Sequence, residues 1–477
     1  MRRSARVLAL LAGSAVLAAP ALADDLRDAL VAAYNTNPSL QAARAQQRAV
    51  DEGVPLARAE GLPGASASAT HTEVLKDSTA NPLGPERVLN GSVTLGVPIY
   101  SGGAVRSSLR AAKVRVEAGQ ADLRGAESGV FSAVVAAYMD VILSQSVVSL
   151  QRNLVRVLST NLQATRDRFE IGDLTRTDVA QSEARLELAR SDARSAEANL
   201  IAARERYIQL VGKAPVDLQS PPPLPGLPAG PDDALAIALE HNPDLIAARE
   251  RTKAAGHDID VAGSTRLPRV EVFTSGTLTD YYGTLGNGGP GFDQSATGAT
   301  AGVRATIPIF QGGRPAALRR QAQARASATM EQEIAVERAV VAQVRAAHAS
   351  WRAANDVIAS TRTAVAAAEL SLEGVRAENS VGNRTILDIL DAEQELLQAR
   401  VRLVTAERNA YVAGFSLLAA MGKAEARDLG LDGGPLYDPQ ANYARVRSRV
   451  FDWGNDPAPA PQATRTVDTP AQDGDIQ

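Results

Sequence analysis

The sequence predicts an α+β membrane protein built from two copies of one elongated unit. Short motifs recur at an offset of 205 residues early in each half and 210 residues later: Asn37-Pro38 returns as Asn242-Pro243, and Gly172 returns as Gly382. Each half also holds stretches in which apolar and polar residues alternate, typical of β-strands, and long stretches without proline, typical of helices. The absence of cysteine excludes disulfide scaffolds and thiolate metal sites, and 4% aromatic residues disfavour a thick core.

The first residues form a predicted signal peptide over residues 1–23. A basic head containing Arg2, Arg3 and Arg6 precedes an apolar run, and Ala21-Leu22-Ala23 is a small-x-small cleavage site. The chain is therefore expected to be exported. Its formal net charge of −4 argues against a nucleic-acid binder, because no basic excess is present to neutralise phosphates. We expect no later stretch to be long and apolar enough for a transmembrane helix, so only strands remain to cross a membrane.

The repeat divides the mature chain into four parts. We place a first repeat at 24–213, a proline-rich linker at 214–231, a second repeat at 232–423 and a C-terminal segment at 424–477 whose last twenty or so residues are disordered. Each repeat opens with a helix that is interrupted at Asn37 or Asn242, since asparagine followed by proline suits a fresh helix start.

Each repeat contains two predicted strands, four in all. They lie near residues 65–75, 88–100, 269–280 and 299–310, and the aromatic Phe273 falls on the polar face. About ten residues suffice to cross a bilayer when a strand is tilted, although an ordinary soluble hairpin is the alternative. Tyr100 and Phe310 at strand ends suit an interfacial aromatic girdle. Four strands cannot close a barrel, and open edges cannot face lipid, so several chains must share one barrel.

Long helical hairpins follow the strands. Residues 104–171 and 314–381 are predicted to be continuous helices of ~100 Å at 1.5 Å per residue, with return helices starting near Asp173 and Asn383. In the second return helix two adjacent columns repeat every seven residues, which predicts a left-handed coiled coil. The alternative is a stripe that faces a globular core. The columns are Ile389, Leu396, Leu403, Ala410 and Leu417, and Leu390, Leu397, Val404, Tyr411 and Leu418.

These motifs together resemble the TolC-like outer-membrane efflux proteins. The resemblance covers nearly the whole mature chain and is most specific at residues 380–392 and 169–178, and at the Pro-Ile-aromatic-x-Gly-Gly turns that start at Pro98 and Pro308. It implies a homotrimer in the outer membrane, with a shared twelve-stranded barrel and a helical tunnel through the periplasm. It also implies passive conduction for an ABC or RND inner-membrane pump through a periplasmic adaptor (membrane fusion protein), in tripartite efflux or type I secretion.

The resemblance also implies roles for particular residues. Asp388 and Asp391 share one helix face and match the ring that constricts the aperture; a simpler role is to complement the helix dipole. Asp178 and Arg384 match a closed-state latch, in which Asn379 stands where the family has a tyrosine. Further matches are the adaptor-contacting tips and the joints between barrel and helices: Gly172, Gly382 and Thr385, and Pro63, Pro98, Pro268 and Pro308.

Two other classes of function are weighed against a duct. No zinc-site spacing surrounds the four histidines, and no P-loop or nucleophile elbow is present, so we expect no enzyme, cofactor or metal site. A soluble periplasmic coiled-coil adaptor shares the signal and the heptads but has no need of four bilayer-length strands. Without a cysteine to carry a lipid anchor, the strands and the outer-membrane lipid around them must hold the chain in the membrane.

Overall fold

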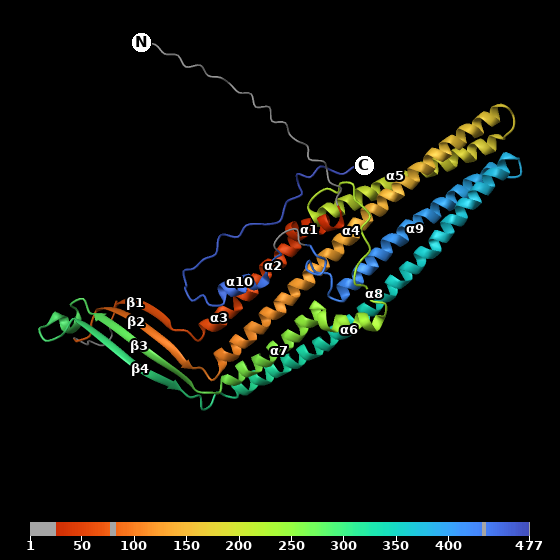
Figure 1. The fold of residues 1–477 in the computed structure, drawn as a ribbon. Helices are drawn as coiled ribbons and strands as arrows, with labels where there is room; N and C mark the ends of the chain where they lie inside the picture. The colour runs from red at the N-terminus through yellow and green to blue at the C-terminus, as the bar shows by residue number, and fades with distance from the viewer. Residues whose placement is uncertain (1–24, 77–82, 432–435, 477) are drawn as a thin grey trace, which may run out of the picture.

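The computed structural model describes residues 25–76, 83–431 and 436–476. The predicted signal peptide lies outside the described residues. The elements in chain order are α1 (Leu26–Thr36), α2 (Pro38–Asp51), α3 (Gly53–Ala59), β1 (Gly64–Glu73), β2 (Arg87–Tyr100), α4 (Ala104–Glu170), α5 (Arg176–Val211), α6 (Pro231–His241), α7 (Pro243–Ser264), β3 (Arg269–Asp280), η1 (Leu285–Gly288), β4 (Ser295–Thr306), α8 (Arg314–Ser380), α9 (Ile386–Ala420) and α10 (Pro439–Val446). The sheet lies at one end of a long, narrow molecule and the tips of two helical hairpins lie at the other (Figure 1).

The two repeats have the same order of elements. Helices α4 and α8 are continuous over 67 residues each, as the sequence predicts. The predicted interruptions are also present, because Asn37 and Asn242 cap α2 and α7 through side chains that accept backbone N–H bonds. One break was not expected. Helix α2 ends before Gly53 and α3 restarts there, whereas the corresponding α7 runs unbroken for 22 residues.

The four strands form one antiparallel sheet in the order β1-β2-β3-β4. Strands β1 and β4 are its edges, and neither has a second partner within the described chain. Unpaired N–H and C=O groups along an edge need another strand, most of all in lipid. The sheet is therefore complete only when other chains pair with both edges.

The sheet corrects the predicted bounds of its last strand and explains the position of Phe273. Strand β4 ends at Thr306, opposite Arg269 where β3 begins, so the predicted strand at 299–310 starts four residues earlier and stops four residues earlier. Phe273 lies opposite Gly302. The missing Cβ at Gly302 leaves room for the ring, and the Arg304 guanidinium lies 4.7 Å from the ring centroid, which accounts for an aromatic residue on the polar face.

The main core lies where α4 passes the first helices and the ends of the return helices. Phe131, Val135 and Tyr138 of α4 are fully buried there. This apolar stretch makes α4 long and apolar enough to cross a membrane by composition, with a mean hydropathy of 1.6 over 18 residues. The expectation that no such stretch follows the signal is therefore wrong. The reason is that a helix covered by neighbours on several sides becomes apolar on several sides.

Helix α9 packs against two sets of neighbours, and each of its two heptad columns faces a different one. Ile389 and Leu396 pack with residues of α8, whereas Leu390 and Leu397 pack with leucines of α4 and α5. One column thus holds its own hairpin together and the other holds the second repeat against the first. This is a helical wall and not a stripe over a globular core.

The C-terminal segment folds back along the outside of α5 (Figure 1). Its described residues after α10, 447–476, have no regular secondary structure, yet the buried Arg204 donates to the Asp473 and Asp475 carbonyl oxygens at 2.9 and 2.8 Å. Arg152 donates to the Gly474 carbonyl oxygen at 3.1 Å. The predicted disorder of the whole tail does not hold for these residues, because two arginines of the hairpin bind its backbone.

Candidate functional site at the hairpin tips

The two tips are built from one local design. In the first, Gly172 at φ 83° ends α4, and its N–H donates to the Phe169 carbonyl oxygen at 2.9 Å. In the second, Gly382 at φ 81° ends α8 in the same way, with a bond of 3.0 Å to the Asn379 carbonyl oxygen. Only glycine adopts this backbone without strain. Both glycines therefore reverse the chain at the tip, and an adaptor contact at these residues stays a prediction.

Each return helix starts with a reciprocal cap. The Thr385 hydroxyl accepts from the Asp388 N–H at 3.4 Å, and the Asp388 carboxylate accepts from the Thr385 N–H and hydroxyl at 2.8 and 2.7 Å. Thr175 and Asp178 make the same pattern in the first repeat. These hydrogen bonds from threonine hold the pKa of both carboxyl groups below its usual range. The helices consequently begin at Arg176 and Ile386, three residues after the positions that the sequence predicted.

Asp388 and Asp178 thus have a clear local role as caps. Within one chain the ion-pair partners of Arg384 are Glu378, at 2.8 Å, and Asp388, at 3.8 Å. The Asn379 side chain donates to the Arg384 carbonyl oxygen at 2.7 Å and so fastens the same loop. The structure does not bring Arg384 to Asp178 within the chain. A latch between them would have to join neighbouring chains, and it stays a prediction.

Asp391 has a partner that the sequence analysis missed. Arg185 of α5 donates to its carboxylate at 2.7 Å, so this ion pair joins the two repeats just above the tips. A signal was present in the repeat. At the offset of 210 residues, Gln181 corresponds to Asp391 and Arg185 corresponds to Glu395. At both pairs of equivalent positions the two repeats thus carry different charges, neutral against acidic and basic against acidic.

A small apolar cluster lies behind this ion pair. It joins α4, α5 and α9 and consists of Leu154, Leu158, Leu162, Leu186, Ala189, Leu390 and Leu397. The buried Glu393 carboxylate on α9 accepts from Arg376 of α8. The contact within the second hairpin thus includes a charge pair whose carboxylate is buried and whose guanidinium is half-exposed, whereas the contact between the hairpins near the tips consists of a few leucines and one exposed ion pair.

The four predicted joint prolines lie at or near the ends of the sheet. Pro63 and Pro268 immediately precede β1 and β3, and Pro308 follows the end of β4. Pro98 lies within β2, beyond the last residue that pairs with β1, at a shift in register with β3. Its missing N–H therefore costs no ladder bond on the β1 side.

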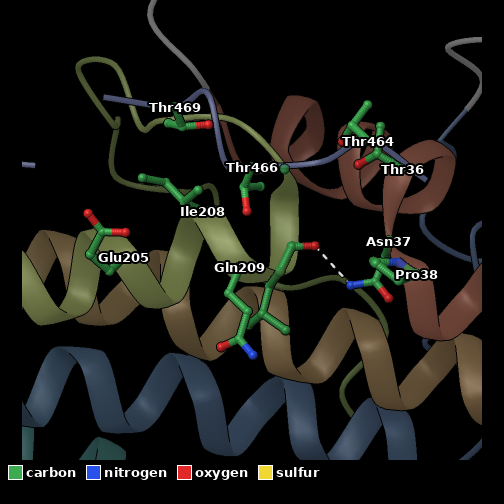
Figure 2. Close-up of a pocket in the computed structure, with 11 residues that line it drawn as sticks. Thr36, Asn37, Pro38, Glu205, Ile208, Gln209, Thr464, Thr466 and Thr469 are labelled. Carbon is green, nitrogen blue, oxygen red and sulfur yellow. Dashed lines mark hydrogen bonds between the residues drawn. The ribbon is translucent and has the colours of Figure 1, made fainter. Parts of the chain in front are cut away.

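A pocket midway along the molecule lies where the tail crosses the first repeat. Figure 2 shows it between the break of α1 and α2, the end of α5 and the threonines Thr464, Thr466 and Thr469. The Asn37 side chain donates to the Leu210 carbonyl oxygen at 2.9 Å, drawn as a dashed line. Asn242 makes the equivalent bond to Ala420. Because the same bond recurs in the other repeat, where these threonines have no counterpart, we attribute it to folding.

The comparisons with known proteins agree with this geometry. The family profile for outer membrane efflux proteins matches residues 29–213 and 234–423. The chain is 32% identical over 448 residues to the outer membrane efflux protein BepC of Brucella suis biovar 1, covering 93% of this chain and 94% of that protein. It is 27% identical over 427 residues to the outer membrane protein TolC of Escherichia coli strain K12, covering 85% and 84%. The solved CmeC outer membrane channel of Campylobacter jejuni has the same fold, with a TM-score of 0.74, 16% identity and 89% of each chain covered. The predicted fold class and outer-membrane location are confirmed.

Proposed function

The chain belongs to the outer membrane efflux protein family, and from this premise we propose that it is a trimeric exit duct gated at its periplasmic tips. The duct passively conducts cargo from an inner-membrane pump, through a periplasmic adaptor, in tripartite efflux or type I secretion. The observation that carries the proposal is the Arg185–Asp391 ion pair, which joins the two hairpins at the end of the molecule remote from the sheet.

The trimer follows from the open edges of the sheet together with family membership. Three chains supply twelve strands and pair β1 of each chain with β4 of the next. Threefold symmetry then places three copies of Asp388 and Asp391 around one axis. A ring of carboxylates at a constriction favours cations and is blocked by multivalent ones. The soluble-adaptor alternative is set aside because the family consists of outer-membrane proteins.

A thiol crosslink tests the gate directly, because the chain contains no cysteine of its own. The double variant Arg185→Cys and Asp391→Cys, bridged by a short bifunctional reagent, should hold the hairpins together. In planar bilayers the bridged trimer should stay at its lowest conductance, and cleaving a reducible bridge should release it. A control bridge between Glu369→Cys and Arg400→Cys lies within the second hairpin and should have no effect. If the bridged tips conduct as well as the unbridged ones, the gate is elsewhere.

The adaptor contact needs a separate test in cells. A photoreactive residue in place of Thr385, at the exposed tip, should capture a periplasmic adaptor. The same residue in place of Ala458, in the C-terminal segment, is the matched control and should capture none. Equal capture at both positions, or capture at neither, would count against docking at the tips.

A further inference from the structure

A group of exposed apolar side chains lies on a loop that the proposed gate does not use. The loop follows α10 and carries Val450, Phe451 and Trp453, which are 63%, 74% and 84% exposed. Three large apolar side chains within four residues exceed the scattered exposure that is normal on a protein surface. Such a patch marks contact with another molecule.

The loop is held in place at both ends. Arg445 of α10 donates two hydrogen bonds to the Asp456 carboxylate, at 2.7 and 2.8 Å, and Arg449 donates a third at 3.2 Å. These bonds, above all those from Arg445, lower the pKa of Asp456 to about 2. Helix α10 is itself fixed to α2, since the Asn442 amide donates to the Asp51 carboxylate at 2.7 Å. The apolar residues are therefore presented by a closed loop.

The position of the loop relative to the sheet indicates what it contacts. A hollow of the surface is lined by Phe451 together with Leu62, Pro63 and Gly64, where the chain enters β1, and the loop lies beside the start of that strand (Figure 1). Gly64 pairs with Gly96, and the exposed Tyr100 follows four residues later on β2, ~13 Å along the strand at 3.3 Å per residue. The loop therefore lies at the end of the sheet that adjoins the helices, where we expect the strands to leave the membrane.

We propose that Phe451 and Trp453 insert into the periplasmic leaflet of the outer membrane, at the boundary between headgroups and acyl chains. Tryptophan favours this boundary because its ring is apolar and its N–H finds a polar partner there. The anchor is continuous with the membrane-crossing sheet and fixes the height of the helical wall below it. It depends on the outer-membrane location and is independent of the proposed gate.

Tryptophan fluorescence tests the anchor with almost no background. The chain has two tryptophans, and the second, Trp351, lies in α8 ~55 Å from the start of that helix at 1.5 Å per residue. The trimer of the Trp351→Phe variant is reconstituted in phosphatidylethanolamine–phosphatidylglycerol vesicles. Lipids brominated near the headgroup, or near the ends of the acyl chains, quench according to depth. The Trp453→Phe variant, which keeps Trp351 alone, is the matched control.

The expected result is strong quenching of Trp453 by the shallow bromolipid, weaker quenching by the deep one and none of Trp351. Emission that is untouched by both bromolipids overturns the proposal. Acrylamide then identifies the surroundings, because a neighbouring chain would shield Trp453 from acrylamide and open water would not. If Trp351→Phe lowers the yield of trimer, the same lipids applied to the unmodified protein should quench only the part of its emission that comes from Trp453.

Discussion

The ion pair between the repeats gives a quantitative test of the gate. A guanidinium nitrogen of Arg185 lies 2.7 Å from a carboxylate oxygen of Asp391, but the two side chains are 42% and 65% exposed. Solvent screening limits such a pair to ~0–1 kcal/mol. If the three ion pairs of a trimer break together on opening, they stabilise the closed state by up to ~3 kcal/mol. At ~1.4 kcal/mol per factor of ten, this raises the closed-to-open ratio roughly a hundredfold. Arg185→Ala should therefore raise the open fraction by up to this factor.

Single-channel recording of the reconstituted trimer measures that fraction. Asp391→Ala should raise it to a similar degree, and the double variant should add little to either, because one interaction is lost in all three. Salt should weaken the unmodified closed state and leave the variants nearly unchanged. Arg400→Ala removes a pair of equal length within the second hairpin and serves as the control. If the effects of Arg185→Ala and Asp391→Ala add fully, the two residues do not act on the gate through each other.

Three further predictions concern the cap, a buried acid and the tail. Thr385→Ala removes the α9 cap and should speed amide hydrogen exchange in the first turn of that helix severalfold, in line with the ~1 kcal/mol typical of a lost N-cap; unchanged exchange would show that the cap is dispensable. Burial raises the pKa of Glu127, so its ionised form opposes folding. Glu127→Gln should accordingly raise the thermal midpoint at pH 8, and the gain should vanish below its unfolded pKa of ~4.3; a gain that persists at pH 3 would contradict this cause. A Cβ at position 474 would come within 2.8 Å of the Glu197 Cβ, so Gly474→Ala should release the tail and hasten its proteolysis, and an unchanged cleavage rate would argue against tail docking.

The sequence predicted those parts of the fold that depend on local rules. The Asn-Pro breaks, the strand segments and the two long helices follow from caps, alternation and the absence of proline, all of which act within a few residues. The additional break at Gly53 also had a local signal, Gly53 and Pro55, which the prediction overlooked; the equivalent positions of the continuous α7 are Asp258 and Asp260. The docked tail was missed for a different reason. Its composition is that of a disordered segment, and what holds it is Arg204, more than 250 residues away in the chain.

The residues at the hairpin tips likewise fall into those that a local motif predicts and those that depend on contacts between distant helices. Thr385 and Asp388 were predicted as tip residues, and their capping box is a local motif that the sequence already contains. Arg185 was missed because its partner is on another hairpin, and heptads show which face of a helix is apolar without showing which neighbour covers it. The resemblance to a family supplied roles for individual residues. It offered none for Arg185, whose evidence comes from the geometry of this chain.

The packing of α9 explains how two similar hairpins could form a gate. Ile389 and Leu396 bind α9 to α8, where the buried Glu393 carboxylate also accepts a hydrogen bond from the half-exposed Arg376. Toward the first hairpin, α9 offers Leu390 and Leu397 and the exposed Asp391. Helix α9 packs along α8 more extensively than along α4 and α5, so the weaker of its two interfaces is the one between repeats. A force applied at the tips should part the hairpins before it opens either of them, so the second hairpin should move as one body.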